Sequence, residues 1–134
     1  MNRAVMRSRS NAVEGIGLLL CLFLGEYCEI VHGRTYVVGG KQGWDLYPEL
    51  MNWPTGKRFK ARDVLVFNYK TEGGNLYSLA RVNKTGYELC EVGDHAKRFR
   101  TGHDRVKLVM GANYFICSVR DFCGYGMRIA LLAK

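Results

Sequence analysis

Cysteine and histidine are the residues of this sequence that could ligate a metal or carry redox chemistry. There are five cysteines and three histidines in 134 residues. His95 stands in G-D-H-A and His103 in T-G-H-D, two stretches typical of loops, and His32 lies near the start of the chain. A zinc site would need paired cysteines such as C-x2-C, a spacing that does not occur. Spacing alone therefore predicts no metal site.

Catalytic motifs are missing as well. The sequence contains no G-x-S-x-G, no H-E-x-x-H and no phosphate-binding glycine loop, and its carboxylates are scattered. Twenty Lys and Arg residues against twelve Asp and Glu give a net charge of +8. We therefore predict that the protein is not an enzyme. Its basic side chains suit an acidic partner, either a polyanionic glycan, an anionic surface or nucleic acid.

The first 33 residues have the features of a secretory signal peptide. Three arginines within the first nine residues precede an uncharged, mostly apolar run at residues 15–25. Eleven residues rise only about 16 Å as a helix, roughly half of a bilayer core, so this run is too short to span a membrane. Small side chains at residues 31 and 33 predict cleavage between Gly33 and Arg34. The alternative is that the run forms a buried helix of the domain.

Cleavage there would release a secreted domain at residues 34–134. That domain keeps a net charge of +8, because the first 33 residues hold three basic and three acidic groups. No second apolar run of membrane length follows, and the chain ends in I-A-L-L-A-K, so we expect neither a membrane span nor a lipid anchor. Secretion removes nucleic acid from the expected partners and leaves an acidic cell-wall polysaccharide or glycoprotein. We expect a monomer.

Three cysteines remain in the predicted domain: Cys90, Cys117 and Cys123. In an oxidising compartment two of them should pair, and the third would be a buried thiol, an intermolecular partner or a metal ligand. The tripeptide Asn83-Lys84-Thr85 is a glycosylation sequon, which fits secretion and makes Asn83 a candidate acceptor.

Short strands separated by glycine-containing turns account for most of the domain. Residues 63–69 alternate, with Leu65 and Phe67 on one face and the intervening valines on the other. Only residues 47–52 suggest a helical turn, which Pro54 would end. This pattern predicts an all-β sandwich or barrel. The expected strands cover residues 35–38, 63–69, 75–82, 105–108, 113–117 and 127–132.

Five stretches of the domain carry a family resemblance: R-T-Y-V-V-G-G-K-Q-G-W, N-W-P, G-K-R-F-K-A-R-D-V-L-V-F-N-Y, T-G-H-D-R-V-K-L and G-A-N-Y-F-I-C. They resemble the phytocyanins, which are plant extracellular cupredoxins, and look most similar to the basic plantacyanin branch, the basic blue proteins. The resemblance covers residues 34–134 and implies a cupredoxin-like Greek-key β-sandwich with one disulfide, here Cys90–Cys123. Closing that loop would stabilise the domain by about 3–4 kcal/mol.

The resemblance also implies a blue-copper centre, but two of its ligands are replaced. Such a centre needs two imidazole nitrogens and a thiolate in one plane, with a weak axial thioether. Cys117 matches the thiolate and Met127 the thioether, in C-x4-F-C-x3-M, whereas Gly74 and Phe122 stand where the family has its histidines. Changing a group that merely orients a ligand lowers metal affinity about 10–100-fold, so two missing ligands should cost more. We therefore expect no cofactor.

Two functions are consistent with these residues. The first is a secreted phytocyanin-like domain that has lost type 1 copper, keeps Cys117 as a buried thiol, and acts as a binding or signalling module on acidic cell-wall or surface components. The second is a blue-copper electron-transfer protein with non-standard ligands, for which His95 or His103 would have to reach the site. Aromatic residues mostly form the core of a β-sandwich; the alternative is a carbohydrate-stacking platform drawn from Trp44, Trp53, Tyr69, Tyr77, Tyr87 and Tyr125.

Overall fold

The computed structural model describes residues 17–21, 28–74 and 76–134, and side chains from residue 33 onward. The chain divides into two compact units, Met1–Arg34 and Thr35–Lys134. In the first unit, strand β1 (Gly17–Cys21) pairs antiparallel with β2 (Cys28–His32). Part of the apolar run is therefore extended. Within the described residues, no helix is both long and apolar enough to cross a membrane. Cleavage after Gly33 stays a prediction.

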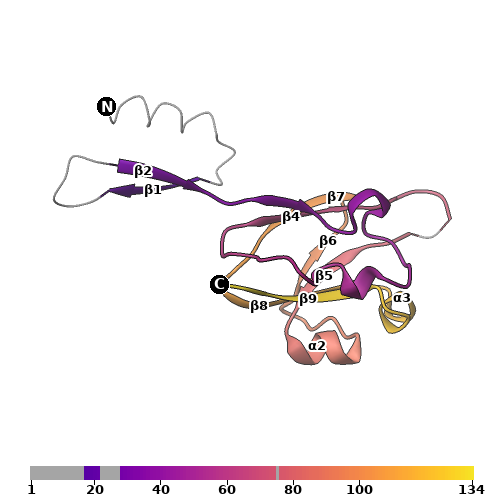
Figure 1. Cartoon of the computed structure of the whole chain (residues 1–134). Helices are drawn as coiled ribbons and strands as arrows, with labels where there is room; N and C mark the ends of the chain where they lie inside the picture. The colour runs from indigo at the N-terminus through magenta and orange to yellow at the C-terminus, as the bar shows by residue number, and fades with distance from the viewer. Residues whose placement is uncertain (1–16, 22–27, 75) are drawn as a thin grey trace. The chain divides into compact units, whose positions relative to one another are not determined.

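Two β-sheets make up the second unit (Figure 1). In the first sheet, β4 (Val64–Asn68) lies between β3 (Thr35–Val37), which runs parallel to it, and β7 (His103–Lys107), which runs antiparallel. The second sheet has the order β6-β5-β8-β9, with every neighbouring pair antiparallel. The prediction of an all-β sandwich is confirmed. The strands of the second sheet are β5 (Leu79–Val82), β6 (Lys97–Phe99), β8 (Gly111–Ile116) and β9 (Arg128–Ala133).

The core lies between the sheets and follows the alternation seen in the sequence. Leu65 and Phe67 on β4 are fully buried and belong to the main apolar cluster, as expected for one face of this strand. Phe67 contacts Trp44 and Phe115, with ring centroids 5.1 Å apart in both pairs, so aromatic packing joins the two sheets. This packing in the core holds β4, β8 and β9 in place relative to one another.

The structure contains more short helices than the sequence predicted. Besides the 3-10 turns η1 (Gly40–Gln42) and η2 (Leu50–Asn52), the domain contains two short α-helices, α2 (Lys84–Leu89) and α3 (Arg120–Gly124). Only the region of η2 was expected to be helical. The expected strand at residues 75–82 begins four residues late, at Leu79, and β6 was not predicted. The basic sequence K-R-F of β6 has no apolar alternation, so only its pairing with β5 makes it a strand.

Asn83 begins α2. Its side-chain Oδ1 accepts a hydrogen bond from the backbone N–H of Gly86 at 2.8 Å, which is the usual way an asparagine caps a helix. The helix ends at Cys90, whose φ of 55° lies in the left-handed region. The sequon asparagine is exposed, but its side chain therefore has a structural role. Glycosylation of Asn83 stays a prediction.

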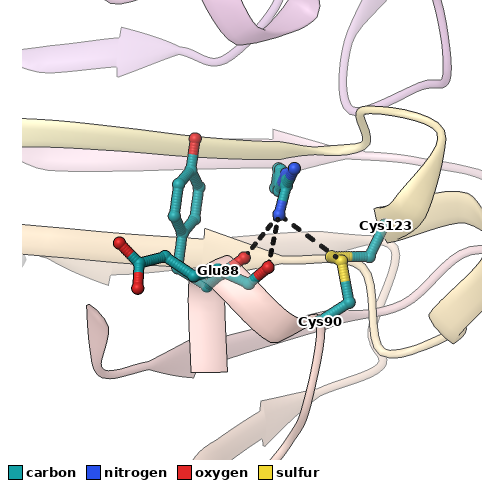
Figure 2. Close-up of a disulfide and its surroundings, with 5 residues drawn as sticks. Glu88, Cys90 and Cys123 are labelled. Carbon is teal, nitrogen blue, oxygen red and sulfur yellow. Dashed lines mark hydrogen bonds between the residues drawn. A yellow bond between two sulfur atoms is a disulfide. The ribbon is translucent and has the colours of Figure 1, made fainter. Parts of the chain in front are cut away.

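A disulfide fastens α2 to α3. Cys90 follows the last turn of α2 and Cys123 lies within α3, with a Cα–Cα distance of 5.7 Å and a sequence separation of 33 (Figure 2). The pairing implied by the family resemblance is confirmed. Cys117 is the free, buried cysteine among the described residues.

Candidate metal centre

Cys117 and Met127 lie side by side at one end of the second sheet. Cys117 directly follows β8 and Met127 directly precedes β9, and the N–H of Cys117 donates to the carbonyl of Met127 at 3.0 Å. Both side chains are fully buried in the main apolar cluster. The pairing of β8 with β9 thus brings together two sulfur-bearing residues that are ten positions apart in sequence. Neither sulfur is open to solvent.

Phe122 closes the same region from α3. Its carbonyl accepts a hydrogen bond from the N–H of Met127 at 2.9 Å, and its ring packs against the main apolar cluster. The ring also meets Tyr77 edge to face, with centroids 5.2 Å apart and planes at 81°. Phe122 therefore fills part of the space beside the two sulfur residues with hydrocarbon.

Gly74 occupies the loop between β4 and β5, and this position is open. A Cβ built on Gly74 would meet no atom within 4 Å, and the backbone there does not have the positive φ found at the neighbouring Gly73. Gly74 lines a cavity of about 580 Å³ together with Tyr77, Asn68 and Tyr69. The position where the family has a histidine thus has room for a side chain but carries none.

The two histidines of the domain lie in different places. His103 was expected in a loop, but it is the first residue of β7, where pairing opposite Asn68 makes it extended. Its Nδ1 contacts Oδ1 of Asn68, and Asn68 lines the cavity beside Gly74. His95 is exposed in a turn and lines a separate cavity with Asn83. Of these two histidines, His103 is the one that contacts a residue lining the cavity beside Gly74.

The residues at the four positions that the family resemblance implies do not supply the donors of a blue-copper centre. Cys117 and Met127 offer sulfur, but Phe122 has no lone pair and Gly74 no side chain, so the two nitrogen donors are missing from these positions. Across the described parts of the chain, no group of three or more His, Cys, Asp or Glu residues is placed to hold a metal ion. What the arrangement provides chemically is a buried thiol beside a thioether, which behaves as apolar packing.

A polar pair that the sequence did not indicate borders the cavity. The hydroxyl of Tyr69 donates to Oδ2 of Asp104, which is 4% exposed. Burial, and after it the hydrogen bond to this carboxylate, raise the pKa of Tyr69 well above its usual value. Thr101 also donates to Asp104, through Oγ1 at 2.6 Å. Asp104 alternates with exposed residues along β7, so its place in the strand, rather than its polar character, decides that it is buried.

Arg128 makes a second set of polar contacts that the sequence did not indicate. At the start of β9 its Nη1 donates to the carbonyl of Tyr87 at 2.6 Å and to that of Glu88 at 3.3 Å, and it lies 3.7 Å from Sγ of Cys90 (Figure 2). Its guanidinium also covers the ring of Tyr87, 5.1 Å from the centroid. These contacts place a cation at the C-terminal end of α2, where it is favoured by the helix dipole.

The aromatic residues do not form one exposed platform. Trp44 is 1% exposed and its Nε1 donates to the carbonyl of Ser78 at 2.9 Å, so it belongs to the core. Tyr87 lies under Arg128, whereas Tyr125 directly follows α3 and is 77% exposed. Stacking on carbohydrate by the whole set is therefore not supported.

Comparison with known proteins identifies the fold and the family. The sequence profile of the plastocyanin-like domain matches residues 44–127. The chain is 42% identical over 99 residues to a basic blue protein of Cucumis sativus, which covers 74% of this chain and 98% of that protein. It is 40% identical over 118 residues to chemocyanin of Lilium longiflorum, which covers 88% of this chain and 89% of that one. The chain belongs to the phytocyanins.

Solved structures agree with this family. Cucumber basic protein, a blue copper protein, superimposes with a TM-score of 0.68 at 40% identity, covering 75% of this chain and 99% of that one. Spinach plantacyanin gives a TM-score of 0.55 at 45% identity, covering 60% of this chain and 85% of that one. Phytocyanins are electron-transfer cupredoxins that normally bind copper, not typical enzymes, and are typically extracellular or cell-surface proteins. That Gly74 and Phe122 stand at the family's two histidine positions stays a prediction from the sequence.

Proposed function

We propose that this phytocyanin is a secreted domain that works without copper, as a binding module for acidic components of the cell wall or cell surface. The observation that carries the proposal is the pair Gly74 and Phe122 at the two imidazole positions, with the Phe122 ring packed edge to face on Tyr77. A domain with a phytocyanin fold but no nitrogen donors at these positions keeps its surface while losing the means of electron transfer through copper.

The charge of the domain supports an acidic partner. Residues 34–134 contain seventeen Lys and Arg residues but nine Asp and Glu, so at least eight cations have no carboxylate to pair with. Lys84 and Glu88 form an ion pair at 4.0 Å on the surface of α2, where both side chains are more than half exposed. Exposed pairs of this kind contribute little to stability, so the excess of positive charge is better explained by binding than by folding.

Copper titration tests the loss of the metal. Purified protein mixed with Cu(II) should stay colourless, because the intense blue absorption requires a Cu(II)–thiolate bond held by two imidazoles. Chelation of any contaminating metal should leave the thermal unfolding midpoint unchanged. Stoichiometric copper with a strong blue band would contradict the copper-independent part of the proposal.

Retention on an acidic polysaccharide tests the binding. Charged groups on the surface interact over about 8 Å at physiological salt, so retention on an immobilised polyuronate should fall steeply as salt is raised. A neutral polysaccharide column is the control. Retention that does not change with salt, or no retention on either column at low salt, would contradict an electrostatic binding role.

A blue-copper electron carrier with non-standard ligands is the second candidate. It is favoured by the adjacent sulfur residues Cys117 and Met127, and by His103, whose partner Asn68 lines the cavity at Gly74. If this candidate holds, His103→Ala should abolish any copper-dependent absorption, while His95→Ala should leave it intact.

A further inference from the structure

A groove of about 690 Å³ lies between residues 51–60 and the last residues of β9. We call it the basic groove and define it by Met51, Arg58, Lys60, Leu132 and Lys134, with their neighbours in these two segments. Figure 1 shows β9 running from α3 toward the C-terminal end of the chain. Six residues of strand span about 20 Å, so the end of the groove at Lys134 lies far from Met127, whereas Met51 at its other end lies close to Gly126.

Backbone pairing fixes one wall of the basic groove. Lys134 donates its N–H to the carbonyl of Phe59 at 3.1 Å, and Ala61 donates to the carbonyl of Lys134 at 3.0 Å. Phe59 itself is 5% exposed and meets the ring of Tyr36 at 4.8 Å. Residues 58–60 are thus held against the end of β9 before any ligand binds, which lowers the entropy lost on binding.

The charged side chains of the basic groove have one sign. Lys57, Arg58, Lys60 and Lys134 line it, and no Asp or Glu does. Lys57 donates from Nζ to the carbonyl of Trp53 at 2.9 Å, which fixes the position of its ammonium group. Asp63 lies close by in sequence, but it is 3% exposed and accepts from the N–H of Lys60 at 2.8 Å. The lining of the basic groove therefore offers cations to a ligand without competing carboxylates.

Apolar side chains are exposed among these cations. Met51 is 41% exposed and Leu132 57% exposed, and both line the basic groove. A small inorganic anion would make no use of such side chains. A uronic acid uses both features, because its carboxylate pairs with a cation while the C–H face of its ring covers apolar atoms. Two surface side chains can contact a sugar ring, but they do not form the deep apolar cavity that an acyl chain requires.

We propose that the basic groove is the binding site of this protein for a uronic-acid polysaccharide. This inference rests on the proposed function as an acidic-glycan-binding module and assigns that function to one surface. Arg58, Lys60 and Lys134 pair with carboxylates of successive sugars, and Met51 and Leu132 contact the sugar rings between them. The site uses neither Cys117 nor Met127, because both are fully buried and neither lines the basic groove.

A charge-reversal pair tests the location. The probe is a purified oligogalacturonate, and its affinity for the full-length purified protein is measured by titration calorimetry at low salt. Arg58→Glu with Lys60→Glu should weaken binding about tenfold or more, since two favourable contacts become unfavourable. The matched control is Arg105→Glu with Lys107→Glu, which changes the net charge equally on exposed positions of β7 and should weaken binding less than about threefold.

A second variant tests the apolar contact. Leu132→Asn leaves the charge unchanged and should weaken binding of the oligogalacturonate about two- to fivefold, the loss expected for part of one apolar contact. Far-ultraviolet circular dichroism and the thermal midpoint show that each variant is folded. If Leu132→Asn folds and binds as tightly as the wild type, the sugar does not lie in the basic groove.

The other outcomes separate the inference from the proposed function. If both charge-reversal pairs weaken binding equally, the polysaccharide is held by the charge of the whole surface, and the basic groove is not its site while the proposed function stands. If the wild type does not bind oligogalacturonate at all, both fail. If dodecanoate binds more tightly than oligogalacturonate and competes with it, the occupant is an anionic amphiphile and the inference is overturned.

Discussion

At Gly74, where the family resemblance predicts a copper ligand, there is space for a side chain. No atom lies within 4 Å of a Cβ built there, and the backbone avoids positive φ, so a histidine meets no steric obstacle. Phe122 is the harder position, because its ring fills space against Tyr77. If both positions are ligand positions, Gly74 lacks the side chain and Phe122 offers only hydrocarbon.

Restoring both histidines should restore copper. In Gly74→His with Phe122→His, two imidazoles join Cys117 and Met127 at the family's spacing, so the protein should bind one Cu(II) and turn blue. Each single variant leaves the plane of three donors incomplete and should bind copper much more weakly. The measurement is visible absorption during copper titration. A double variant that folds yet stays colourless would show that these two positions are not where the ligands belong.

Tyr69 should make stability depend on alkaline pH. Its pKa is raised in the folded protein, first by burial and then by its hydrogen bond to Asp104, so the native state holds the proton more tightly than the unfolded chain does. Stability from this group is complete below the usual tyrosine pKa of about 10, and the free energy of unfolding should fall as pH rises above it. Tyr69→Phe should reduce this fall in urea titrations.

The exposed Tyr125→Phe is the matched control for that experiment. Burial also raises the pKa of Tyr47 and Tyr87, so some alkaline destabilisation remains in either variant. At neutral pH, Tyr69→Phe should lower the free energy of unfolding by about 1–3 kcal/mol, because Asp104 loses a hydrogen bond at a buried position. An unchanged slope above pH 10 would contradict the assignment.

Between elements, Arg128 ties the start of β9 to the end of α2. Its Nη1 serves two helix carbonyls, those of Tyr87 and Glu88, beside the Cys90–Cys123 disulfide. The contact is one of several that hold a helix of only six residues, too short to be stable alone. Because the disulfide and Arg128 act on the same end of α2, we expect their contributions to stability to be coupled.

Arg128→Met should lower the free energy of unfolding by about 1–3 kcal/mol, since it leaves the two carbonyls of α2 without this charged donor. Urea denaturation measures the change. Arg128→Lys is the matched control, because it keeps the charge and one donor and should lose less. Equal losses in both variants would mean that the guanidinium geometry, rather than charge, holds α2, and no loss in either would contradict the role of Arg128.

For the whole molecule, the division into two units bears on processing. The structure separates Met1–Arg34 from Thr35–Lys134, one residue from the predicted cleavage after Gly33. Protein collected from the culture medium should begin at Arg34, because the apolar run at 15–25 is long enough for a signal peptide and too short for a span. N-terminal sequencing and intact mass decide this. Secreted protein that begins at Met1, or at any residue before Glu26, would contradict it.

Part of the fold could be read from local patterns, because the alternation along residues 63–69 correctly placed Leu65 and Phe67 in the main core, although Val64 and Val66 on the other face are also buried. The short helices could not be predicted, since α2 depends on a cap from Asn83, a left-handed residue at Cys90 and a guanidinium from β9. The position of His103 in a strand likewise depends on pairing with Asn68, a residue 35 positions away.

The sequence by itself determined which chemistry is present: sulfur at residues 117 and 127, no imidazole at residues 74 and 122, one extra cysteine and an excess of cations. These are properties of single side chains and of their spacing. Only the tertiary structure decided that Cys117 and Met127 are sealed in the core, that Gly74 has open space, and that residues 51–60 meet the end of β9. Burial, free space and grooves arise where distant segments pack together, and no local pattern contains that information.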